Sequence, residues 1–195
     1  DQLKRESKLT DKSIVVLPEY IGTWLVAANE KEKVYKEPTI EKTITTMVRS
    51  NLFSFFYGYF NSPAKDKSTY AIFHLKAEKM AKNYQQVFST LAKEFNCTIV
   101  AGSIVLPTPS ISATGEFEIK KTGQLYNTSV VFGNDGKILP PLIRKQFPID
   151  EELGFTHAAD SLQQPIFATK AGRMAVLICA DSWYPQAYAN LKNKA

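Results

Sequence analysis

Residues 80–105 read MAKNYQQVFSTLAKEFNCTIVAGSIV, and the fold class follows from this stretch. In its first part, apolar side chains recur at steps of three and four residues, the period of a helix with one buried face. The second part, residues 98–105, is a largely apolar run with the length of a buried strand. A helix that passes directly into a buried strand is typical of layered α/β proteins, so we predict that class. The periodic apolar residues are Met80, Tyr84, Val87, Phe88, Leu91 and Phe95.

Further strands are expected on both sides of this unit. Residues 13–17 (SIVVL) predict a short strand that is buried on both faces. Residues 124–132 and 138–143 flank an Asn-Asp-Gly turn, so we expect them to pair as a hairpin. A second hairpin is expected between residues 165–169 and 173–179.

The remaining segments are less regular. Residues 107–123 are polar and are predicted to form a loop. Residues 183–194 are predicted to be a helix with Pro185 in its first turn, where proline is well tolerated. Residues 41–60 are a weaker helix candidate because their apolar residues follow no clean period.

Composition excludes several classes of protein. The chain has 195 residues, 44% of them hydrophobic, and a formal charge of +5, which fits one soluble domain. Its lysines are scattered among acids, so we expect no nucleic-acid partner. No ligand spacing of Cys or His is present, so no metal and no cofactor are expected. The polar N-terminal residues and the lack of a long apolar run predict a cytoplasmic protein without membrane contact.

Three apolar segments each end in a side chain that can do chemistry. The sequences VVLPE, ILPPLIRK and AVLIC end in Glu19, Lys145 and Cys179. A side chain at the last position of a buried strand is held rigidly and still opens onto a loop, where catalytic groups are concentrated. We therefore expect these three residues to form one site.

The three residue types suit acyl transfer. An ammonium group lowers the pKa of a nearby thiol, so Lys145 is expected to favour the thiolate of Cys179, and the Glu19 carboxylate is expected to accept the thiol proton. The sulfur would attack an amide or nitrile carbon, while Lys145 and the backbone N–H of Ala180 stabilise the charge on the substrate heteroatom. Glu19 would protonate the departing amine and then deprotonate the water that cleaves the thioester.

The motifs LPE, RK and ICADSWYP, ending in or containing these residues, resemble the Glu-Lys-Cys signatures of the nitrilase superfamily of carbon–nitrogen hydrolases. The stretches LYNT and NDGK resemble the strand and turn that precede the family's lysine, and FAT and AGR resemble its approach to the cysteine. The resemblance implies an α-β-β-α sandwich and a homodimer or higher homo-oligomer. It makes residues 1–195 a single hydrolase domain, incomplete at both ends, with a long insertion at about residues 29–69.

The family also uses a second glutamate between the lysine and the cysteine, which supports the lysine. Spacing favours Glu151 for this role, and the adjacent Glu152 is the alternative. The motif Cys179-x-Asp181 looks more like the amidase and carbamoylase branches than true nitrilases, so an amide is the expected small-molecule substrate rather than a nitrile.

Simpler interpretations apply to several other residues. Asp181 is expected to cap the helix that follows it. The aromatic run at residues 53–60 is expected to form core or interface packing, with a lid over the site as the alternative. Cys97 is expected in the core, and His74 and His157 are expected to be structural or surface residues.

Two other functions are compatible with the sequence. One is a catalytically silent binding or assembly module, or a fragment, that kept the fold. The other is an amide-forming acyltransferase, because the same thioester can be captured by an amine instead of water. The lack of spanning helices speaks against the lipid-modifying membrane relatives.

Overall fold

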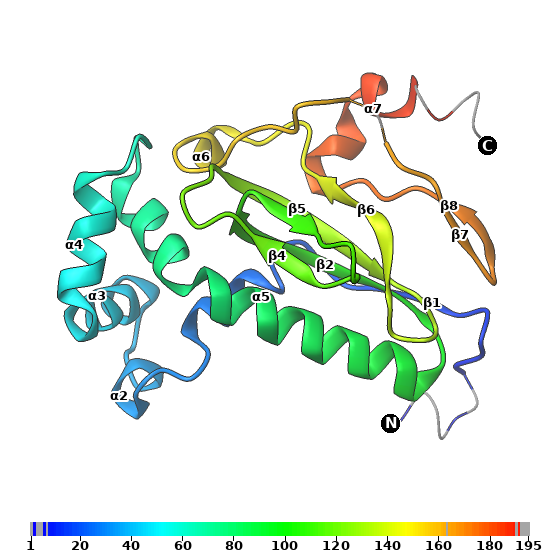
Figure 1. Cartoon of the computed structure of the whole chain (residues 1–195), viewed down its shortest axis with the longest axis horizontal. Helices are drawn as coiled ribbons and strands as arrows, with labels where there is room; N and C mark the ends of the chain where they lie inside the picture. The colour runs from blue at the N-terminus through cyan, green and yellow to red at the C-terminus, as the bar shows by residue number, and fades with distance from the viewer. Residues whose placement is uncertain (1, 3–5, 7, 163, 190, 192–195) are drawn as a thin grey trace.

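A four-stranded sheet with the order β1-β2-β5-β6 forms the centre of the computed structural model, which describes residues 2, 6, 8–162, 164–189 and 191 (Figure 1). Strand β1 (Ile14–Val16) pairs in parallel with β2 (Thr98–Pro107). The neighbours β2 and β5 (Leu125–Phe132) are antiparallel, as are β5 and β6 (Ile138–Arg144). The predicted strands and the first hairpin are therefore confirmed.

Helix α5 (Lys67–Phe95) covers one face of this sheet (Figure 1). The apolar side of α5 and the residues of β2 and β5 that face it form the main hydrophobic core. Tyr84 lies at the centre of this core, fully buried, and donates a hydrogen bond to the Gly102 carbonyl at 3.1 Å. The predicted helix is confirmed and begins earlier than its periodic residues indicated. Val87 is the exception among them, because it points to solvent.

The opposite face of the sheet packs against a small second layer. The hairpin of β7 (Phe167–Thr169) and β8 (Gly172–Met174) lies there, and Phe167 and Ile178 join Val131 and Ile143 in a separate core. The predicted second hairpin is confirmed in place but is shorter than expected. Residues 175–178 have no strand partner among the described residues, so the expectation that a buried strand ends at residue 179 is wrong.

Two further expectations about the sheet need correction. Strand β1 is not buried on both faces, because it lies at an edge of the described sheet and Val16 is 68% exposed. The segment 107–123 is not only a loop, since β3 (Pro109–Ile111) and β4 (Phe117–Ile119) pair within it as an antiparallel hairpin. Phe117 anchors this hairpin by packing into the main core.

Short helices occupy one end of the molecule, far from the β7–β8 hairpin (Figure 1). They share a second small core with α5, built on Val34, Met47 and Phe55. The weak helix expectation for residues 41–60 is confirmed as two helices with a break at Asn51. These elements are η1 (Thr23–Ala27), α2 (Glu32–Tyr35), α3 (Ile40–Ser50) and α4 (Leu52–Phe60).

Three short elements complete the chain: α6 (Asp150–Leu153), η2 (Cys179–Trp183) and α7 (Pro185–Ala189). Proline begins α7, as expected, while part of the predicted C-terminal helix falls on residues 190 and 192–194, outside the described part. Among the residues that the structure describes, no helix combines the length and apolar character that a membrane span requires.

Candidate active site

Glu19 lies where the chain leaves β1 and crosses β2. A β-bulge interrupts β2 between Val100 and Ser103, and Gly102 within it has a φ of +68°. A side chain at Gly102 would meet the Pro18 carbonyl oxygen at 2.3 Å, so only glycine allows this crossing. Ser103 holds the loop from the other side, because its hydroxyl accepts a hydrogen bond from the Tyr20 N–H at 2.9 Å. The bulge therefore sets the position of Glu19.

Lys145 follows β6 directly and points into the protein. Its backbone N–H continues the ladder by donating to the Asn127 carbonyl at 2.9 Å. The Nζ atom lies 2.8 Å from Oε1 of Glu19 and 2.6 Å from Oε2 of Glu152, and only 1% of the side chain is exposed. A lysine is this deeply buried only when its charge is compensated, and here two carboxylates share one ammonium group.

The second carboxylate is Glu152, and the expectation of Glu151 is corrected. Within the single turn of α6, successive side chains point in different directions. Glu152 is buried and faces Lys145, whereas Glu151 is exposed to solvent. The backbone N–H of Ile149 also donates to Oε2 of Glu152 at 2.8 Å, which fixes the carboxylate at the start of this turn.

Two residues that the sequence did not single out for the site join the carboxylates. The side-chain amide of Asn127 on β5 donates to Oε1 of Glu19 at 2.9 Å and to Oε1 of Glu152 at 3.2 Å. The hydroxyl of Tyr20 donates to the same oxygen of Glu152. We call Lys145, Glu19, Glu152, Asn127 and Tyr20 the lysine cluster. A polar run within an apolar strand was the available signal for Asn127, and no signal pointed to Tyr20.

The lysine cluster favours the ionised forms of Lys145 and Glu152. Burial by itself lowers the pKa of Lys145, but the hydrogen bonds and charges of Glu152 and Glu19 outweigh it and leave the pKa raised. Burial by itself raises the pKa of Glu152, but the hydrogen bonds from Lys145, Tyr20 and Ile149 leave it lowered. The ammonium and the Glu152 carboxylate are thus both ionised at neutral pH.

Cys179 begins η2 and is exposed. Its φ of +47° is unusual for a residue with a side chain, and Tyr20 next to Glu19 shares this feature with a φ of +64°. Such strained backbone positions concentrate at functional sites. Glu19 and Cys179 line the same small pocket, together with Ser129, whose buried hydroxyl has no hydrogen-bond partner in the described structure.

The surroundings of Cys179 raise the pKa of its thiol. Burial raises its pKa first, and the hydrogen bond and negative charge of Glu19 raise it further. Lys145 and the backbone N–H of Ala180 act in the opposite direction but do not prevail. The pKa of the thiol is therefore raised rather than lowered, which goes against the expectation that Lys145 favours the thiolate.

Asp181 ties the cysteine turn to the lysine strand. Its side chain is fully buried and accepts hydrogen bonds from the N–H groups of Gln146 at 3.0 Å, Phe147 at 2.8 Å and Ile178 at 3.3 Å. The expectation that it caps the helix starting at Pro185 is therefore wrong. Its oxygens join the residues that follow Lys145 to the residue that precedes Cys179.

The structure thus gathers Glu19, Lys145 and Cys179 at one end of the sheet. The other residues considered from the sequence lie elsewhere. Cys97 is buried in the main core, and His74 stacks on Tyr70. Within the described residues, no group of three His, Cys, Asp or Glu side chains could hold a metal ion.

Comparison with known proteins identifies the family of the chain. Residues 12–195 match the carbon-nitrogen hydrolase family. The omega-amidase NIT3 of Saccharomyces cerevisiae is 28% identical over 133 residues, which are 65% of this chain and 42% of that protein. The chain therefore spans less than half the length of this curated relative.

Solved structures of this superfamily are also similar to parts of the chain. Nit3 of Saccharomyces cerevisiae, a member of branch 10 of the nitrilase superfamily, is 27% identical with a TM-score of 0.46, covering 58% of this chain and 36% of Nit3. A carbon-nitrogen hydrolase from Helicobacter pylori G27 is 24% identical with a TM-score of 0.46, covering 89% of this chain and 53% of that enzyme.

The family match extends over almost the whole chain and includes the segments that carry Glu19, Lys145 and Cys179. The central sheet, α5 and the β7–β8 layer form the layered α/β fold that the sequence predicted. The chain belongs to the carbon-nitrogen hydrolase family of the nitrilase superfamily.

Proposed function

We propose that this chain carries the active site of a hydrolase that cleaves a non-peptide amide through a thioester on Cys179. One observation supports this most directly: Glu19 pairs with the buried ammonium of Lys145 at 2.8 Å and lines the same small pocket as Cys179. A carboxylate in this position can accept the thiol proton while the ammonium remains fully charged.

In the first half-reaction, Glu19 takes the proton from Sγ of Cys179 as the sulfur attacks the amide carbon. The new C–S bond leaves a negative charge on the former carbonyl oxygen. The backbone N–H of Ala180 and the remaining N–H of Lys145 are the donors proposed to stabilise this charge. The C–N bond then breaks, and Glu19 returns its proton to the departing amine.

In the second half-reaction, water replaces the amine. Glu19 accepts a proton from the water while the water oxygen attacks the thioester carbon and forms a C–O bond. The product then leaves as a carboxylic acid. The C–S bond breaks and the sulfur recovers the proton from Glu19. At the end of the cycle Cys179 is again a thiol and Glu19 again a carboxylate, so the scheme requires no cofactor or metal.

Glu152 is proposed to fill the role that the family assigns to a second glutamate. As a second carboxylate on Lys145, at 2.6 Å, it keeps the ammonium charged and in place while Glu19 changes its protonation state. Tyr20 and Asn127 are positioning residues in this scheme, because they act on the carboxylates rather than on the substrate.

An amide is preferred over a nitrile as the substrate because the related NIT3 is an omega-amidase. Ammonia release from a panel of amides, ureides and nitriles tests this choice. We expect release from amides by the parent protein and by Cys97→Ala, and none by Cys179→Ala. Activity confined to nitriles would overturn the choice of substrate.

Intact-protein mass spectrometry tests the thioester itself. After an acid quench, the expected result is an acyl adduct on the parent protein that is absent from Cys179→Ala. If no adduct forms and iodoacetamide labels Cys179 no faster than Cys97, the site is catalytically silent. Faster turnover on addition of an amine, with a new amide as product, would identify an acyltransferase.

The cytoplasmic location and the homodimer or higher homo-oligomer stay predictions, and analytical ultracentrifugation tests the oligomer.

A further inference from the structure

Helix α4 presents a row of aromatic side chains to solvent. Phe53, Phe56, Tyr57 and Phe60 are 93%, 46%, 76% and 73% exposed. Their spacing of three, one and three residues places them on one side of the helix, and we call this row the α4 stripe. Single exposed apolar residues are ordinary, but a contiguous group of large aromatic residues marks an interaction surface.

The other side of α4 is well packed, so the stripe does not result from a loosely held helix. Phe55 is buried in the small core with Met47 and Val34. Gly58 faces α5 so closely that an added Cβ would lie 3.3 Å from Cβ of Ala71. One face of α4 therefore packs against the protein, and the other face is exposed to solvent, where a partner could bind.

Basic side chains flank the stripe at both ends. Arg49 lies in the last turn of α3, and Lys65 and Lys67 follow the end of α4. None of the three forms a salt bridge within the described part of the chain, and Lys67 lies 6.0 Å from the ring centre of Tyr59. Asp66, the acidic residue between these two lysines, is the N-cap of α5 and accepts a hydrogen bond from the Thr69 N–H.

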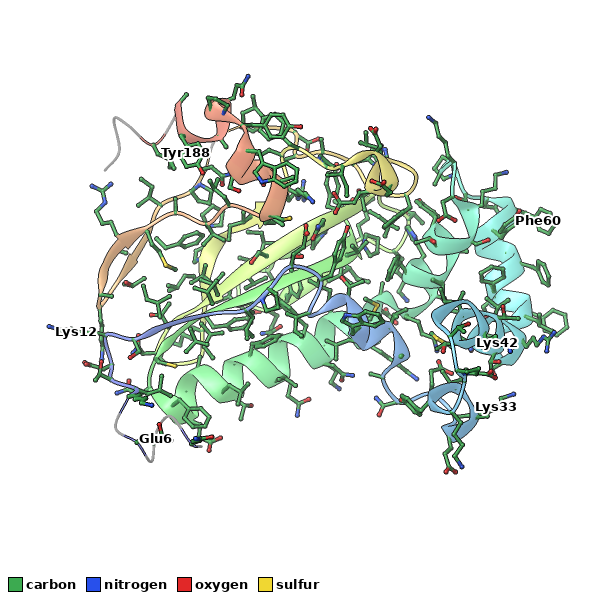
Figure 2. The ribbon with its side chains drawn as sticks, turned by 180° about the vertical axis from the view of Figure 1, so that it is seen from behind. Glu6, Lys12, Lys33, Lys42, Phe60 and Tyr188 are labelled. Atoms are coloured by element: carbon green, nitrogen blue, oxygen red, sulfur yellow. The ribbon has the colours of Figure 1, made fainter. Side chains whose placement is uncertain are left out.

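More cations lie at the same end of the molecule. Lys33 and Lys42 appear there with Phe60 (Figure 2), and like Lys31 they are exposed. Residues 30–67 contain seven Lys or Arg and five Asp or Glu residues, and two of these acids form salt bridges with Lys36 and Lys76. The surface around the stripe therefore combines aromatic side chains with a modest excess of positive charge, which is complementary to an anionic, partly apolar surface.

We propose that the α4 stripe and its flanking cations bind the surface of a membrane that contains anionic lipids. Aromatic side chains are favoured at the boundary between headgroups and acyl chains, and nearby lysines and arginines add electrostatic attraction to anionic headgroups. A second copy of this chain is a poorer occupant, because it would bring the same cations together. With nine residues, α4 lies on the membrane rather than across it.

This proposal replaces the expectation of no membrane contact, which was based on the absence of a spanning segment. It is independent of the proposed hydrolase activity, since α4 and the cysteine turn lie in different parts of the fold (Figure 1).

Flotation of the purified protein with vesicles tests the proposal. Vesicles of phosphatidylcholine alone are compared with vesicles that also contain phosphatidylglycerol. We expect flotation with the anionic vesicles only, reduced by added salt. The double variant Phe53→Ser/Phe60→Ser should lower the partition coefficient by at least about tenfold. Removing Arg49, Lys65 or Lys67 by substitution with Gln should lower it by about fivefold for each charge.

Matched controls come from α5. Val87→Ser removes an exposed apolar side chain and Lys82→Gln removes an exposed charge, and both should leave flotation unchanged. A Phe53→Trp variant should show a blue shift of emission on addition of anionic vesicles. Equal binding to neutral vesicles, or equal losses in the control variants, would contradict the proposal. Failure to float with either vesicle would overturn it and leave a protein partner as the occupant of the stripe.

Discussion

Within the part of the chain that the structure describes, two shielded lysines pair with glutamates, and they differ in burial and in the number of carboxylates around them. Lys76 on α5 pairs with Glu30, and their side chains are 11% and 6% exposed. Lys145 is more deeply buried and faces both Glu19 and Glu152. Each lysine therefore has a carboxylate partner, but only Lys145 has two.

The extra carboxylate changes what the lysine can do. The Lys76–Glu30 pair is electrically balanced and joins the chain before α2 to α5, which is a structural task. In the lysine cluster, Glu152 alone balances Lys145, so Glu19 remains available to accept a proton from Cys179. One pair holds the fold together, whereas the cluster holds the fold and, in the proposed mechanism, supplies a base.

The largest expected effect comes from removing each lysine. Lys145→Met leaves two facing carboxylates without a cation, so we expect a loss of about 3–5 kcal/mol in the free energy of unfolding. Turnover of folded protein should fall by at least about 10³-fold. Lys76→Met should reduce stability but leave turnover per folded molecule unchanged. Urea unfolding and amide hydrolysis measure the two quantities. Equal loss of turnover in both variants would contradict the distinction.

The next effect concerns the carboxylates. Glu19→Gln removes the proposed general base, so turnover should fall by about 10²–10⁴-fold. It also removes two influences that raise the pKa of Cys179, so the midpoint of iodoacetamide labelling against pH should move to lower pH. Glu30→Gln is the matched control and should leave the labelling profile unchanged. An unchanged midpoint in Glu19→Gln would show that Glu19 does not act on the thiol.

A smaller effect is expected on acid stability. The pKa of Glu152 is lowered in the folded protein, so its contribution to stability is present above its unfolded pKa and is lost as pH falls through the folded value. Glu152→Gln should therefore be less stable than the parent at neutral pH by about 2 kcal/mol, and the difference should shrink below about pH 4. Urea titrations across pH measure this gap.

Glu151→Gln is the control for that experiment, since this neighbour is exposed and should change nothing. A gap that stays constant on acidification, or an equal effect in Glu151→Gln, would argue against the assignment of Glu152.

The smallest expected effect distinguishes the roles of Tyr20 and Tyr35. Tyr20 donates to Glu152, and the hydroxyl of Tyr35 donates to the Ala27 carbonyl at 2.6 Å and accepts from the Glu30 N–H at 3.1 Å. Both Tyr→Phe variants should cost about 1 kcal/mol of stability. Only Tyr20→Phe should also change the pH profile of turnover, because it alone touches a carboxylate of the lysine cluster. Identical profiles would make Tyr20 a merely structural residue.

Local patterns were sufficient for the elements that position the site. The period of three and four residues predicted α5, and the apolar run after it predicted β2, because burial of one helix face and of a central strand leaves a direct trace in composition. Glu19, Lys145 and Cys179 could be singled out for the same reason, since each follows an apolar segment.

Side-chain direction within short turns could not be predicted in the same way. Glu151 and Glu152 are adjacent and chemically equivalent, and only the packing of α6 decides which of them faces Lys145. Asp181 has the sequence context of a helix cap, yet the approach of the residues after Lys145 makes it a buried acceptor of three N–H groups. The aromatic run divides in a similar manner, with Phe55 in the core and the α4 stripe in solvent.

The amino-acid sequence by itself determined the layered α/β class, the family and the three reactive residue types, because these depend on local periodicity and on motifs. The tertiary structure alone decided the protonation of the site. The pKa of Cys179 is raised by burial and by Glu19, which comes from the other end of the chain. Charge balance is a property of distances in space, and no local pattern records it.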